Sequence, residues 1–180
     1  MKSKILGLLA LGLLAGPVWA NGVVPLGWAN LQWPYTLTYT VNPVTRTDPI
    51  YGQAWLSGVT NQPGATPGLE AWVGFGSSAD PLTWTDWVAA SFNTDAGNND
   101  EFVGYLQPLY GGVYNYAYRY SYSGGPYMYA DINGPQSGIL QNPGILTVNG
   151  PAAPVPEPGT LALLGLGLAG LGLSRRRKAN

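Results

Sequence analysis

The residues that could carry out chemistry in this 180-residue chain are few. The chain has no histidine and no cysteine, so it cannot build a Ser-His-Asp or Cys-His nucleophilic site, and it lacks the usual zinc ligands and any disulfide. Carboxylates remain, and they allow a glycosidase with two acidic side chains or a calcium site with oxygen ligands. Most hydrolase chemistry is therefore excluded.

One segment gathers oxygen ligands. NTDAGNNDEF, residues 93–102, could hold a calcium ion through Asp95, Asn98, Asp100 and Glu101. Its spacing differs from that of an EF-hand, and segments rich in Asn and Asp also form ordinary turns. Asp100 and Glu101 make a poor catalytic pair, because neighbours on a strand face opposite sides. Calcium is thus an option for this segment, and no other cofactor is expected.

Glu70 and Asp86 are the other two carboxylates that could face each other across strands, although no rule of sequence requires it. They keep a carboxylate-dependent glycosidase open as a third choice of function. We expect instead a protein that is not an enzyme.

Aromatic residues point to a different chemistry, the stacking of rings on sugars. In VYNYAYRYSY, residues 113–122, tyrosine occupies every second position, so five tyrosines share one face of a strand. Exposed together they would form a large apolar patch, so we expect the central ones to fill the core. The candidates for carbohydrate binding lie near the following turn or on the other face of their strands: Trp72, Trp87, Tyr122, Tyr127 and Tyr129.

The two tryptophans are placed by alternation along their strands. In LEAWVGFG, residues 69–76, the apolar residues share one face and leave Trp72 on the other. In LTWTDWVAASF, residues 82–92, Trp84 aligns with Val88, so Trp87 points the opposite way. The structural alternative to ligand binding is cross-strand packing of the two indoles with each other or with Arg119.

The elements that must position these residues are short strands. Helical periodicity is scarce, and runs rich in Tyr, Trp, Val and Thr alternate with turn residues. We expect strands over residues 35–41, 50–59, 69–76, 82–92, 101–107, 113–122 and 126–132, with 139–148 as a further strand. This spacing predicts an all-β fold, a single immunoglobulin-like β-sandwich over residues 21–149.

Two apolar segments flank this domain. Residues 1–20 have lysines before an uncharged stretch and a Gly-Pro break, which predicts a signal peptide cut by signal peptidase after Ala20. An uncleaved anchor is the alternative. We expect residues 150–160 to form a proline-rich linker, residues 161–173 a transmembrane helix, and residues 174–180 a basic cytoplasmic tail.

Charge divides the chain as well. Residues 21–154 contain two basic and eight acidic residues, a net charge of −6, whereas the whole chain carries −1. An acidic surface repels phosphate backbones, so we expect no nucleic-acid partner.

The C-terminal order of a Pro-Glu-Pro triplet, an apolar segment and a basic end resembles the PEP-CTERM sorting signal. The residues that carry the resemblance are Pro156, Glu157, Pro158, Arg175, Arg176, Arg177 and Lys178. The resemblance implies an exosortase substrate that is exported, anchored in the membrane before sorting, and then placed at the cell surface or in the extracellular matrix. It also implies an association with exopolysaccharide. A plain membrane anchor is the alternative.

The middle of the chain resembles immunoglobulin-like accessory modules of secreted bacterial proteins. The segments concerned are YGQAWLSGVT, GLEAWVGFG, WTDW, NTDAGNNDEF, VYNYAYRYSY and YADING. This resemblance implies a non-catalytic β module. We therefore expect an exported envelope or matrix protein, with a carbohydrate-binding module as the alternative.

Overall fold

A computed structural model of the protein describes residues 26–154. This range contains ten strands and one short 3-10 helix, η1 (Pro81–Thr83). The strands are β1 (Trp28–Trp33), β2 (Thr36–Thr40), β3 (Ile50–Trp55), β4 (Leu69–Gly76), β5 (Asp86–Ala96), β6 (Asn99–Gly104), β7 (Gly112–Tyr122), β8 (Met128–Asp131), β9 (Gly134–Gln136) and β10 (Gly144–Asn149). The predicted all-β fold is confirmed.

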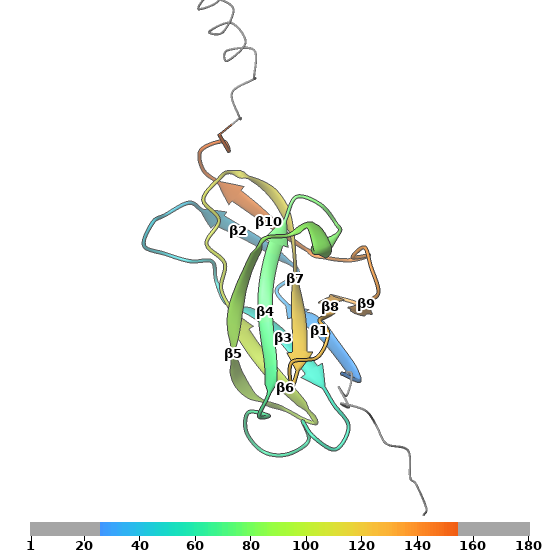
Figure 1. Cartoon of the computed structure of the whole chain (residues 1–180). Helices are drawn as coiled ribbons and strands as arrows, with labels where there is room; N and C mark the ends of the chain where they lie inside the picture. Colours follow the sequence, from blue (N-terminus) through green and yellow to red (C-terminus); the bar gives the residue numbers. More distant parts are fainter. Residues whose placement is uncertain (1–25, 155–180) are drawn as a thin grey trace, which may run out of the picture.

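Strand pairing follows one path, β1-β3-β6-β5-β4-β7-β10-β2, folded into two layers (Figure 1). The layers meet in β5. Its first half, up to Ala90, pairs with β4, and its second half, from Ser91 on, pairs with β6 with a register shift between Phe92 and Thr94. We call β1, β3, β6 and the second half of β5 sheet I, and the remaining strands sheet II. Within sheet II, β10 pairs with β2 in parallel, and β8 and β9 extend from the edge of β7. The predicted β-sandwich is therefore present.

The core between the sheets is built around the tyrosine row of β7. Tyr116, Tyr118 and Tyr120 are fully buried. Their hydroxyls cross the core: Tyr116 donates to Pro34 O, Tyr118 donates to Ile50 O at 2.6 Å and Tyr120 donates to Asn30 O at 2.8 Å. Burial raises the pKa of all three phenols. The row thus fastens sheet II to backbone carbonyls on the other side of the core.

Gly52 makes room for this crossing. A Cβ at Gly52 would lie 2.2 Å from the Tyr120 hydroxyl and 2.8 Å from a ring carbon of Tyr118. The close approach of two rings to β3 therefore requires a residue without a side chain.

Several strand boundaries differ from the predicted ones. Strand β5 begins at Asp86 rather than at residue 82, because Asp80 Oδ1 accepts a hydrogen bond from Leu82 N and starts η1. Trp84 therefore precedes the strand and does not share a face with Val88. Strand β3 ends at Trp55, β10 begins only at Gly144, and β1 and β9 were not predicted.

The predicted signal peptide, Pro-Glu-Pro triplet, transmembrane segment and basic tail lie outside residues 26–154. Within that range, no helix has the length and apolar character needed to cross a membrane.

Candidate functional site

The outer face of sheet II carries a group of aromatic residues around one arginine. Trp72 on β4 lies opposite Arg119 on β7, and Arg119 lies opposite Tyr129 on β8. Trp87 on β5 and Tyr127, which directly precedes β8, complete the group. We call these five residues the aromatic cluster. The register of four neighbouring strands therefore gathers rings that are up to 57 residues apart in the chain.

Arg119 is the centre of the aromatic cluster. Its guanidinium carbon Cζ lies 4.1 Å from the ring centroid of Tyr127, 4.5 Å from that of Trp87 and 5.3 Å from that of Trp72. Its Nε is buried and has no hydrogen-bond partner within the described residues. Contacts between the cation and the rings thus hold the guanidinium and fix the positions of the rings around it.

The rings also contact one another at their edges. The ring centroids of Trp72 and Tyr127 are 5.3 Å apart, with an angle of 86° between the ring planes. Those of Trp87 and Tyr129 are 5.7 Å apart, with an angle of 61°. These edge-to-face contacts leave parts of the ring faces uncovered. Tyr127 is 46% exposed, and the other four residues are half-buried.

Trp84 supports the aromatic cluster from the side. Its indole stacks on Trp87, with 5.4 Å between the ring centroids and 28° between the ring planes, and its Nε1 donates a hydrogen bond to Ser78 O at 2.9 Å. Glycines let both indoles lie against β4, because a Cβ at Gly74 would be 2.4 Å from Trp87 and one at Gly76 would be 2.3 Å from Trp84. Trp87 is therefore held flat against the strand. The predicted place of Trp84 beside Val88 is wrong, since Trp84 packs with Ala117 and Leu140 in a small separate cluster.

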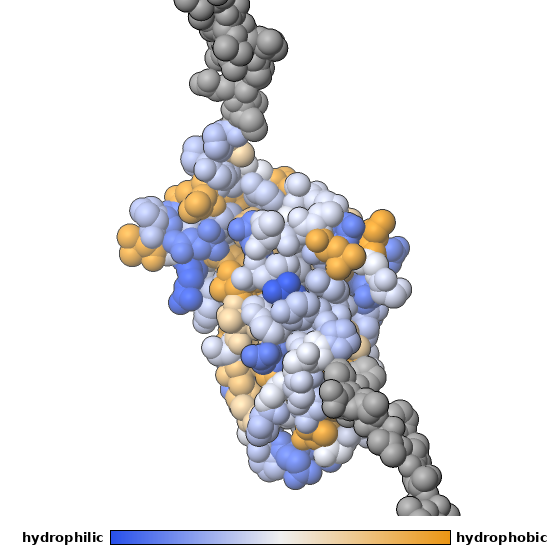
Figure 2. Space-filling model, in the orientation of Figure 1, coloured by the Kyte–Doolittle hydropathy of each residue, from blue (hydrophilic) through white to orange (hydrophobic). Residues whose placement is uncertain are grey.

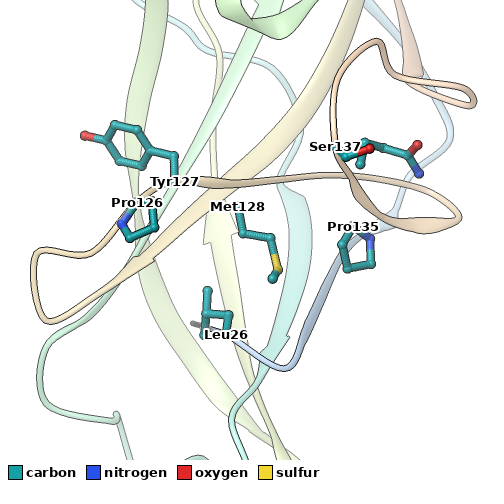
Figure 3. Close-up of a pocket in the computed structure, with 7 residues that line it drawn as sticks. Leu26, Pro126, Tyr127, Met128, Pro135 and Ser137 are labelled. Atoms are coloured by element: carbon teal, nitrogen blue, oxygen red, sulfur yellow. The ribbon is translucent and has the colours of Figure 1, made fainter. Parts of the chain in front are cut away.

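Two hollows lie beside the aromatic cluster. One, of about 270 Å³, includes Trp72 and Ala89 and opens where β5 leaves β4. The other, of about 380 Å³, lies on the far side of Tyr127, and Figure 3 shows Met128 and Pro135 turned toward it while the Tyr127 ring points away. Figure 2 shows that the face formed by β4, β5 and β7 is mostly pale or blue, with orange confined to separate small patches. Strongly hydrophobic residues therefore form no large continuous patch on this face.

Four of the five predicted carbohydrate-binding residues belong to the aromatic cluster, and Tyr122 does not. Tyr122 lies on the inner face of β7 with the buried tyrosines and packs, partly buried, against the core. From the sequence, Arg119 is predicted only as a packing partner of the two tryptophans. Its central position depends on the pairing of β4, β7 and β8, which no local pattern reveals.

Of the four predicted calcium ligands, Asp95 and Asp100 lie opposite each other on β5 and β6 and both contact residues 64–66, whereas Asn98 and Glu101 do not hydrogen-bond with that segment. Asp100 is fully buried and its Oδ2 accepts from Thr66 N at 2.9 Å, while the carboxylate of Asp95 accepts from Gly64 N at 3.0 Å. Glu101 Oε1 accepts from Asn93 Nδ2 at 2.6 Å, and the Asn98 side chain is exposed in the turn before β6. Across residues 26–154, no three Asp or Glu side chains converge as a metal site would require. Asp95 and Asp100 instead hold the backbone of residues 64–66.

Glu70 and Asp86, the two candidate carboxylates for glycosidase chemistry, are far apart. Asp86 lies opposite Phe75, five residues along β4 from Glu70, which corresponds to roughly 17 Å at the rise of a strand. Paired glycosidase carboxylates are separated by about 5–9.5 Å. Asp100 and Glu101 lie on opposite faces of β6, as alternation predicts.

Comparison with known proteins gives two kinds of match. The family described as the PEP-CTERM protein-sorting motif matches residues 154–178. An amylopullulanase from Thermoanaerobacter thermohydrosulfuricus is 27% identical over 173 residues, which covers 73% of this chain and 11% of that enzyme. An amylopullulanase from Thermoanaerobacterium thermosulfurigenes is 26% identical over 115 residues, which covers 54% of this chain and 6% of that enzyme. No solved structure matches.

The match at residues 154–178 agrees with the order of motifs in the sequence, a Pro-Glu-Pro triplet followed by an apolar segment and a basic end. The two relatives are many times longer than this chain, and the chain spans only 11% and 6% of their lengths. The chain is therefore a β-sandwich protein that carries a PEP-CTERM sorting motif, the signal of an exported, membrane-anchored precursor.

Proposed function

We propose that this protein is an envelope or extracellular-matrix component that binds polysaccharide without cleaving it. In this proposal signal peptidase releases the N-terminus, the C-terminal segment holds the precursor in the membrane, and exosortase processes the sorting motif. The β-sandwich then contacts exopolysaccharide through the aromatic cluster. The observation that carries the proposal is the set of half-exposed rings fixed around Arg119.

The chemistry of the aromatic cluster suits a sugar. Pyranose rings present C–H faces that pack on aromatic rings, and their hydroxyls accept hydrogen bonds from a guanidinium. The rings are already fixed by Arg119 and Trp84, so little side-chain entropy would be lost on binding. The net charge of −6 over residues 21–154 favours a neutral polysaccharide over a polyanion.

The names of the two relatives support a carbohydrate ligand for this protein. Both are named as amylopullulanases, enzymes whose name refers to pullulan. The similarity covers only 11% and 6% of their lengths, so it supports a shared accessory module rather than shared catalysis. The separation of Glu70 from Asp86 along β4 also favours binding over hydrolysis.

The experiment is electrophoresis of the full-length protein through gels that contain pullulan or one of several bacterial exopolysaccharides. We expect the wild type to be retarded on at least one polymer. Trp72→Ala and Tyr127→Ala should lose the retardation, because each removes stacking surface at the edge of the cluster. Leu82→Ala is the matched control, since Leu82 is 69% exposed and lies outside the cluster.

Thermal melting of each variant shows whether the fold survives the substitution. A wild type that migrates identically with and without every polymer would reject polysaccharide binding and leave a purely structural role in the matrix.

A further inference from the structure

A second aromatic surface lies on the outer face of sheet I. Trp28 on β1 is directly opposite Trp55 on β3, and the next strand, β6, begins at Asn99. The residues that alternate with the two tryptophans, Ala29 and Ala54, are fully buried in the core. The two indoles therefore point away from the core, on the sheet opposite to the aromatic cluster.

Trp28, Trp55, Asn98 and Asn99 line an open hollow of about 460 Å³. That volume is within the usual range for small-molecule sites. All four lining residues are neutral, and they combine two indoles with two amides. An amide supplies both a donor and an acceptor, which matches the hydroxyls of a sugar, while the indoles match its C–H faces.

The walls of this hollow are held in place by the fold. Asn99 Nδ2 donates to Gln53 Oε1 at 2.9 Å, and Asn98 O accepts from the buried Thr60 Oγ1 at 2.7 Å. A Cβ at Gly27 would lie 2.6 Å from the Trp55 ring, so the backbone of Gly27 lies directly against that indole. A surface that is ordered before binding loses less entropy when a ligand arrives.

From this arrangement we infer that Trp28, Trp55, Asn98 and Asn99 form a second binding surface for a neutral oligosaccharide segment. The ligand class is the same as in the proposed function, and the inference rests on it to that extent. Because the two surfaces lie on opposite sheets, one domain holds two polysaccharide segments at once. A matrix protein with this property would cross-link two polysaccharide chains instead of binding only one.

The test is the binding stoichiometry of the full-length protein with maltoheptaose and with pullulan, measured by titration calorimetry in a detergent without a sugar headgroup. We expect two equivalents of maltoheptaose per chain for the wild type. Trp28→Ala and Asn98→Ala should each leave one equivalent, Trp72→Ala should also leave one, and Trp28→Ala combined with Trp72→Ala should leave none.

Asn98→Ala tests the second surface without disturbing the fold, because the Asn98 side chain is exposed and the hydrogen bond from Thr60 is made to its backbone carbonyl. Asn149→Ala is its matched control, an exposed asparagine on β10, and should keep two equivalents.

The outcomes separate this inference from the proposed function. A single equivalent that Trp72→Ala abolishes and that Trp28→Ala and Asn98→Ala leave intact would overturn the second surface alone. A single equivalent that Trp28→Ala and Asn98→Ala abolish and that Trp72→Ala leaves intact would show that the second surface binds and the aromatic cluster does not. Absence of binding to both maltoheptaose and pullulan would overturn the second surface, and it would overturn the proposed function as well if no polymer retards the protein in gels.

Discussion

At the scale of single residues, the tyrosine row shows what alternation can and cannot predict. A period of two predicts which side chains share a face, and the central tyrosines are indeed buried. Alternation does not predict that Tyr118 and Tyr120 donate to Ile50 O and Asn30 O, because the acceptors belong to strands 68 and 90 residues away.

Substitution of Tyr118 separates packing from hydrogen bonding. Tyr118→Phe leaves the ring but removes the donor to a buried carbonyl, and we expect a loss of about 1–2 kcal/mol of unfolding free energy. Tyr118→Ala also opens a cavity, and the loss should be about 3–5 kcal/mol. Urea unfolding of both variants measures the difference. Equal losses would show that the ring does not pack as described.

The buried phenols also predict how stability depends on pH. Burial raises the pKa of Tyr116, Tyr118 and Tyr120, so the folded state keeps protons that the unfolded state releases above a pKa of about 10. Their contribution is fully present below pH 10 and is lost as the pH rises toward the folded pKa values. Between the unfolded and folded pKa values, each tyrosine changes the free energy of unfolding by about 1.4 kcal/mol per pH unit.

Unfolding curves at pH 9, 10 and 11, together with the ultraviolet absorbance of tyrosinate, measure this dependence. Tyrosinate signal from all 12 tyrosines while the protein remains folded would contradict the burial of the row.

At the scale of elements, the sequence locates most strands but not their partners. Runs such as LEAWVGFG become strands with the predicted bounds, Leu69–Gly76. WANLQW has no β-branched residue, and β1 forms because β3 supplies its pairing partner. The change of partner within β5 likewise depends on the arrangement of the two sheets. The hollow beside Trp28 and Trp55 was missed for this reason, since it exists only once β1 pairs with β3.

The connection from β8 to β10 depends on one carboxylate. Asp131 is fully buried, Oδ1 accepts from Asn133 N and Gln136 Nε2, and Oδ2 accepts from Gln141 N and Asn142 N at 2.9 and 2.7 Å. An amide nitrogen in place of one oxygen would face a donor, so we expect Asp131→Asn to lower the unfolding free energy by about 2–3 kcal/mol.

Thermal melting of the full-length protein checks this effect, with Asp80→Asn, in the exposed cap of η1, as a milder control. A midpoint for Asp131→Asn equal to that of the wild type would show that the carboxylate does not anchor residues 133–142.

At the scale of the whole molecule, the described chain begins at the lower right of Figure 1 and ends after β10 at the top. The sorting motif at residues 154–178 therefore follows directly from the end of the sandwich formed by β2 and β10. This motif could be identified from sequence alone, because its three parts are contiguous. The aromatic cluster could be identified only in part, because its residues come from four strands.

Replacement of Pro156, Glu157 and Pro158 by alanine tests the sorting motif. In a host that contains exosortase, we expect a full-length precursor that stays in the membrane fraction, because the recognition sequence is gone while the apolar segment remains. Immunoblots of the membrane and external fractions measure this. The control is Asp48→Ala, an exposed acidic residue within the domain. Unchanged maturation of the triple variant would contradict the proposed processing.

The most direct test of polysaccharide binding through the aromatic cluster is the response of the indole N–H signals in nuclear magnetic resonance spectra. The full-length protein, labelled with ¹⁵N, is titrated with the polymer that retards it in gels, and Trp→Phe variants assign the signals. We expect the signals of Trp72 and Trp87 to shift, while that of Trp33, which is 56% exposed but lies outside both aromatic surfaces, stays in place. Indole signals of Trp72 and Trp87 that remain unmoved at saturating polymer would contradict the account.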